Sequence, residues 1–107
     1  MKEIKFTYSG KEYVLTYTRE SVVEAERMGM NMSGMEGKPI GTMLDIFRYS
    51  FLAHHKAVSE KTINEIYKLF DDKTGLIEKL ADMYRETVET LMSDDKSKNA
   101  IKWEANF

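Results

Sequence analysis

The sequence predicts an α+β fold, in which an N-terminal β-hairpin and a C-terminal strand pack on a bundle of about four helices. Three observations lead to this prediction. The chain has 107 residues, which favours a single domain over 1–107. Apolar and polar residues alternate near both ends, as in half-buried strands. Between the ends, apolar residues recur at intervals of three and four, as in amphipathic helices.

Residues 2–18 are expected to form the hairpin. The apolar residues of the first strand alternate from Ile4, and those of the second alternate from Tyr13. Ser9 and Gly10 supply the turn between them, because glycine tolerates a positive φ. A lone hairpin is only marginally stable in water, so this one must pack on the rest of the domain.

Residues 19–92 are expected to be mainly helical. Thr18 is a candidate N-cap for the first helix, since its hydroxyl can accept a hydrogen bond from a free N–H of the first turn. Gly29 is expected to end that helix in the left-handed conformation. The segment 30–38 contains two glycines and is expected to be a loop.

The second helix is expected to be the central one. Pro39 fits its first turn, where the missing N–H costs nothing. Apolar residues cover most of its circumference, which is typical of a helix in the middle of a domain. These residues are Ile40, Met43, Leu44, Ile46, Phe47, Phe51, Leu52 and Ala53.

Two further helices complete the bundle. Ser59 and Thr62 are equal candidates for the start of the third helix. Residues 71–75 are expected to separate it from the fourth helix. The apolar stripe of the fourth helix comprises Leu76, Ile77, Leu80, Met83, Tyr84, Val88 and Leu91.

The last part of the chain combines a polar link, residues 93–99, with a predicted strand, residues 100–107. Ile101, Trp103 and Phe107 lie on one face of this strand. Two alternatives stay open. The strand can dock on the sheet of its own chain, or it can add to the sheet of a neighbouring copy.

Composition excludes several classes of function. Sixteen basic and eighteen acidic residues give a formal charge of −2, which argues against nucleic acid as a partner. Without cysteine, the chain has no disulfides and no thiolate chemistry. No apolar stretch is long enough to span a membrane, and nothing at the N-terminus is typical of a secretory signal. We therefore expect a soluble intracellular protein.

The search for chemistry yields no catalytic, metal or cofactor site. His54 and His55 are neighbours, and adjacent residues on a helix point in different directions, so we expect one to lie beside the apolar stripe and the other in solvent. The glycines of residues 33–39 are not spaced as in a phosphate-binding loop. No serine lies in a nucleophile-elbow pattern. We expect no enzyme activity and no cofactor.

Methionine usage provides a candidate interaction surface. The chain has eight methionines, and four of them surround the first loop. Methionine is flexible and polarizable, so it suits a surface that adapts to a partner. Met28 is interpreted as filling a gap under the loop. The candidate partner-binding residues are Met30, Met32 and Met35 together with Ile101, Trp103 and Phe107.

Four segments resemble a family of short phage and prophage proteins. They are residues 1–22, 51–55 (Phe-Leu-Ala-His-His), 63–67 (Ile-Asn-Glu-Ile-Tyr) and 99–107. Proteins of this family are encoded among the tail genes of long-tailed phages of Gram-positive hosts. They resemble tail assembly chaperones.

The resemblance implies a non-catalytic protein of the host bacterial cytoplasm that coats the tape-measure protein and keeps it soluble. The major tail protein is a second candidate partner, and the chain is expected to form homo-oligomers. The alternative is a structural tail or head–tail connector subunit that is retained in the virion.

Overall fold

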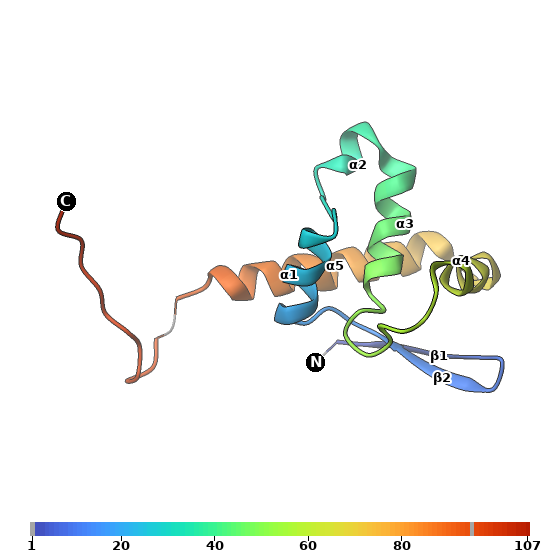
Figure 1. Cartoon of the computed structure of the whole chain (residues 1–107), viewed down its shortest axis with the longest axis horizontal. Helices are drawn as coiled ribbons and strands as arrows, with labels where there is room; N and C mark the ends of the chain where they lie inside the picture. The colour runs from blue at the N-terminus through green and yellow to red at the C-terminus, as the bar shows by residue number, and fades with distance from the viewer. Residues whose placement is uncertain (1, 95) are drawn as a thin grey trace.

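The computed structural model describes residues 2–94 and 96–107. The first elements are β1 (Ile4–Tyr8) and β2 (Lys11–Leu15), which form an antiparallel hairpin. Helices then make up most of the described chain (Figure 1). They are α1 (Arg19–Arg27), α2 (Gly34–Gly37), α3 (Pro39–Tyr49), α4 (Glu60–Leu69) and α5 (Lys73–Met92). The α+β prediction is confirmed.

The hairpin has the predicted position and a two-residue turn. Ser9 and Gly10 have φ values of 50° and 76°, so both central residues adopt the left-handed conformation that matches the twist of the two strands. The register pairs Phe6 with Tyr13, and their rings stack with centroids 5.2 Å apart. The face that carries Tyr13 and Leu15 is buried against the helices.

Helix α1 begins and ends at the predicted residues. Ser21 N–H donates to the Thr18 hydroxyl oxygen at 3.1 Å, and Thr18 N–H donates to Ser21 Oγ at 2.8 Å. This reciprocal pair satisfies two donors at the start of the helix. At the other end Gly29 has a φ of 113°, so the chain turns there in the left-handed region that favours glycine.

Helix α3 is central over only half of its length. Ile46 and Phe47 are fully buried, but Ile40 is 67% exposed and Leu44 is 38% exposed. Figure 1 shows why: the first half of α3 and the short α2 project from the body of the domain. The expectation that Ile40 and Leu44 belong to the core is therefore wrong, because apolar periodicity does not reveal where a helix leaves its neighbours.

The last two helices start at side-chain caps. Thr62 N–H donates to Ser59 Oγ at 3.2 Å, so Ser59 is the N-cap of α4. Gly75 N–H donates to Asp72 Oδ1 at 3.1 Å, so Asp72 is the N-cap of α5. The break between the helices is shorter than predicted, because Gly75 already lies inside α5.

The core joins the hairpin to α3 through aromatic rings and one buried hydroxyl. Phe47 of α3 lies against Phe51 and Phe70, with ring centroids 5.2 and 5.6 Å apart. Phe6 of β1 lies against the same two rings, at 6.5 and 4.9 Å. The Tyr17 hydroxyl donates to the carbonyl oxygen of Ile46 in the last turn of α3. Burial raises the pKa of Tyr17 well above its ordinary value, which keeps this donor protonated.

The outer edge of β2 is covered by residues 50–55, which follow α3. Thr16 N–H donates to the Ser50 carbonyl oxygen at 3.2 Å, and Val14 N–H donates to His55 Nε2 at 3.0 Å. The register places Val14 outside the ladder bonds to β1, so its amide points away from β1, and Thr16 directly follows the end of β2. This segment therefore takes the place of a third strand at the β2 edge.

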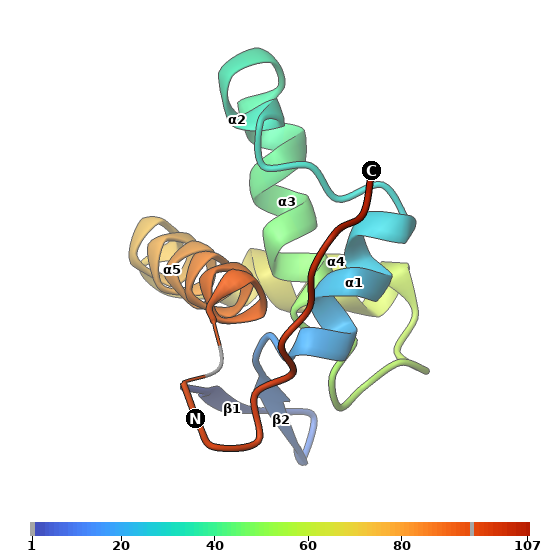
Figure 2. The same cartoon turned by 90° about the vertical axis from the view of Figure 1, so that its left-hand side faces the viewer.

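Residues 100–107 do not form the predicted strand. They are extended, lead away from the bundle in Figure 1, pass in front of it in the view of Figure 2, and form no ladder with any described residue. The prediction of a third strand docked on its own sheet is therefore wrong for the isolated chain. The residues alternate as in a strand, but a strand needs a partner: residues 50–55 occupy the β2 edge, and the segment leaves the end of α5 that lies away from the β1 edge.

Candidate partner-binding surfaces

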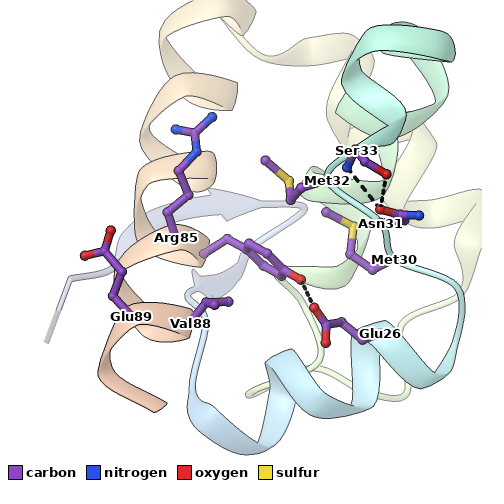
Figure 3. A pocket seen from close by; sticks show the side chains of 9 residues that line it. Glu26, Met30, Asn31, Met32, Ser33, Arg85, Val88 and Glu89 are labelled. Atoms are coloured by element: carbon purple, nitrogen blue, oxygen red, sulfur yellow. Dashed lines mark hydrogen bonds between the residues drawn. The ribbon is translucent and has the colours of Figure 1, made fainter. Parts of the chain in front are cut away.

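A groove of about 420 Å³ lies between the loop after α1 and the second half of α5. Met30 and Met32 line one side, and Val88 and Arg85 line the other (Figure 3). Tyr84, Glu26 and Glu89 also belong to the lining. The groove therefore combines an apolar interior with charged residues around it.

The turn at the end of α1 places Met30 in one side of this groove. Met30 N–H donates to the Ala25 carbonyl oxygen at 2.9 Å, and Gly29 N–H donates to the Glu26 carbonyl oxygen at 3.1 Å. These two bonds form a Schellman motif, in which the residue after the glycine packs back on the helix. Met30 is consequently only 4% exposed.

The Tyr84 hydroxyl connects the two walls of the groove. It donates to Glu26 Oε2 at 2.5 Å, although the two residues are 58 positions apart in the chain. Burial raises the pKa of Tyr84, and the Glu26 carboxylate raises it further, so the hydroxyl stays protonated at neutral pH. This hydrogen bond fixes α5 against α1 and sets the width of the groove.

The lining of the groove can accept an apolar side chain. Its only buried hydroxyl already donates to Glu26, and Arg85 Nη1 donates to Asp82 Oδ1 at 3.2 Å outside the lining. The flexible side chains of methionine can change conformation to fit different apolar groups. An amphipathic helix that buries one stripe and leaves its charges at the rim fits this arrangement.

The exposure of two methionines differs from what their predicted roles imply. Met30 was predicted to contact a partner, but its side chain is mostly buried in the core and only borders the groove. Met28 was predicted to fill a gap, but it is 56% exposed. Met32 and Met35 are half-buried against the core, and Met32 lines the groove. Met35 does not line the groove.

The other three predicted partner-binding residues lie far from the groove, on the extended segment. Ile101 is 92% exposed, Trp103 is 84% exposed, and the Phe107 side chain is fully exposed. Three large apolar side chains exposed on one short segment are uncommon on a monomer surface.

The two histidines have the expected separate environments. His55 lies against the Tyr13 ring, with centroids 5.0 Å apart, and accepts a hydrogen bond from Val14 N–H. Burial lowers the pKa of His55, and the charges of Lys11 and His54 lower it further. His54 is exposed. Within residues 2–94 and 96–107, no three His, Asp or Glu side chains gather in a group that could hold a metal ion.

Comparison with known proteins assigns the chain to a family. A family model described as a domain of unknown function, DUF5055, matches residues 1–107. The chain belongs to the DUF5055 family. No curated protein and no solved structure matches this DUF5055 chain. Over the part of the chain that the structure describes, no helix has the length and apolarity needed to cross a membrane.

Several residues on the surfaces of the DUF5055 chain escaped prediction. Tyr84 and Val88 were assigned to the apolar stripe of a helix, and they also line the groove because α5 extends beyond its neighbours. Leu69, which is 72% exposed at the end of α4, was not singled out. For Met30 a signal was present: a glycine C-cap predicts that the next residue packs back on the helix.

Proposed function

We propose that this protein is a non-catalytic phage tail assembly chaperone that binds the tape-measure protein in the host bacterial cytoplasm. The observation that carries the proposal is the groove between Met32 and Val88, which offers an apolar, adaptable surface inside a charged rim. A tape-measure protein is a long helical client, and a helix presents apolar side chains at intervals of three and four to such a groove.

Each copy would bind the client weakly, and many copies together would bind it tightly. One groove of about 420 Å³ accepts only a few side chains of a client. Many copies along one helical filament would each add such a contact, and linked contacts raise the overall affinity by orders of magnitude. A client covered in this way exposes less apolar surface, which is what keeps it soluble.

Co-expression tests the proposal. The tape-measure protein of the same genome is expected to aggregate alone and to co-elute with this protein on gel filtration when both are expressed. Met32→Lys and Val88→Lys place a charge on opposite walls of the groove and are expected to abolish co-elution. Met28→Lys is the matched control, because Met28 is exposed outside this groove.

Two results would contradict the proposal. One is a tape-measure protein that is equally soluble alone and forms no complex. The other is the presence of this protein in purified virions at the stoichiometry of a tail component, which mass spectrometry would detect. The second result would favour the alternative of a structural tail or head–tail connector subunit.

A further inference from the structure

We infer that residues 101–107 of one copy add as an antiparallel strand to the β1 edge of a second copy, with Trp103 in the groove between β1 and α4. The inference concerns contacts between identical chains and does not require the client. It can be tested with the purified protein alone, so its failure and the failure of the chaperone proposal are distinguishable.

The β1 edge is the open edge of the sheet. Ile4, Phe6 and Tyr8 occupy the hydrogen-bonded pairs of the hairpin register. Lys5 and Thr7 occupy the alternate pairs, so their backbone N–H and C=O groups point outward. On the β2 side, the outward amide of Val14 and the amide of Thr16 bond to residues 50–55, whereas no described residue bonds to the outward groups of Lys5 and Thr7. An exposed strand edge of this kind is a template for another strand.

An apolar groove of about 230 Å³ runs beside the same edge. Phe6, Thr7 and Tyr8 line it from the strand, and Leu69 and Phe70 line it from the end of α4. Thr7 contributes although its side chain belongs to the outer face, so the groove opens along the edge. Its size suits one large aromatic side chain.

The extended segment has the sequence that this edge requires. Ile101, Trp103 and Phe107 alternate with polar residues, and all three are exposed. An antiparallel register with Glu104 opposite Lys5 places opposite charges on the outer face. The same register places Trp103 beside Phe6 on the inner face.

The geometry favours a second copy over the same chain. The groove lies beside the residue that precedes the N-cap of α5, and the segment leaves the opposite end of that helix (Figure 1). Helix α5 has 20 residues and spans about 29 Å. Eight residues separate Met92 from Ile101, and the nine Cα–Cα steps between the two reach at most about 32 Å when fully stretched. A return to its own edge would need a straight link along the whole helix.

Exchange between copies in this manner is directional. The donated segment and the receiving edge are different surfaces, so each copy can donate to one neighbour and accept from another. Such a head-to-tail contact produces rings or filaments rather than closed two-fold dimers.

Two substitutions separate the donor from the receiver. Trp103→Ala removes the donated aromatic ring, and Leu69→Lys places a charge in the receiving groove. Both residues are strongly exposed, so neither change is expected to shift the melting temperature of the monomer.

Light scattering coupled to gel filtration, from micromolar to millimolar protein, is expected to show oligomers of the wild type. Each variant should raise the dissociation constant by about thirtyfold or more. Ile40→Lys, at a similarly exposed apolar residue on α3, is the matched control and should leave the oligomers intact.

Mixing the two variants provides the decisive measurement. Chains with Trp103→Ala still offer a β1 edge, and chains with Leu69→Lys still offer a donor segment. An equimolar mixture is therefore expected to form dimers that grow no further. A wild type that stays monomeric, oligomers that survive both substitutions, or a mixture that stays monomeric would each overturn the inference. Loss of thermal stability in the Trp103→Ala monomer would do the same, because it would show docking within one chain.

A disulfide between copies tests the register. The natural chain has no cysteine, so Lys5→Cys in one chain and Glu104→Cys in another provide the only thiols. Directly opposed residues of an antiparallel ladder lie at a separation that a disulfide can bridge. The mixture is expected to form a covalent dimer under mild oxidation. Faster cross-linking of Thr7→Cys with Glu104→Cys would overturn this register.

Discussion

Replacement of Met30 by alanine tests how the end of α1 shapes the groove. Met30 is 4% exposed and is held by the Schellman turn at Gly29. Truncation of a buried methionine to alanine costs about 2–5 kcal/mol of unfolding free energy. We expect about 2–3 kcal/mol here, because the side chain borders the open groove and its neighbours can relax into the space. A loss of this size lowers the melting temperature by about 10 °C.

Urea unfolding followed by circular dichroism measures this loss. The midpoint is expected to fall while the dependence on urea stays unchanged, since the same surface is exposed on unfolding. The matched control is Met28→Ala: Met28 is 56% exposed, so its truncation should change the unfolding free energy by less than about 0.5 kcal/mol. Equal losses from both substitutions, or a larger loss from Met28→Ala, would refute the assignment of Met30 to the core.

Three further predictions concern single groups. Because the pKa of His55 is lowered in the folded protein, the unfolded chain takes up a proton at a higher pH than the folded chain does. The free energy of unfolding should therefore be greatest above about pH 6.5 and fall as the pH drops below it. Urea unfolding of the wild type and of His55→Gln measures this fall. Tyr84→Phe should lower the free energy of unfolding by about 0.5–1.5 kcal/mol through loss of the hydrogen bond to Glu26. It should also remove one tyrosine that ionises late in the alkaline absorbance titration of the six tyrosines, and an unchanged titration would contradict the raised pKa. Asp72→Ala should lower the free energy of unfolding by about 1 kcal/mol, because α5 loses its N-cap. Thermal unfolding should show little change for the control Asp71→Ala, since Asp71 is an exposed neighbour.

The local elements were predictable because their signals lie within a few residues of one another. Thr18 and Gly29 mark the two ends of α1, and both act through hydrogen bonds to the adjacent turn. The hairpin turn at Ser9 and Gly10 is local in the same sense. For these elements the tertiary structure adds packing but does not change the assignment.

The relations between elements could not be predicted in the same way. Ile40 lies in an apolar stripe, yet it is exposed because α3 extends past the bundle, and helical periodicity does not encode the position of a neighbouring helix. The cover of the β2 edge depends on His55, whose imidazole meets a backbone N–H 41 positions away. Residues 100–107 carry the pattern of a strand, but pairing depends on which edges other segments leave open.

The junction between β2 and α3 has a consequence for how the domain opens. Two consecutive residues after the hairpin, Thr16 and Tyr17, donate to carbonyl oxygens at the end of α3. The hairpin cannot detach without breaking its hydrogen bonds to the last turn of that helix. The end of the helix cannot unwind without leaving the buried Tyr17 hydroxyl with no acceptor. Native-state hydrogen exchange should therefore report one opening free energy for the amides of both elements, as for a single cooperative folding unit.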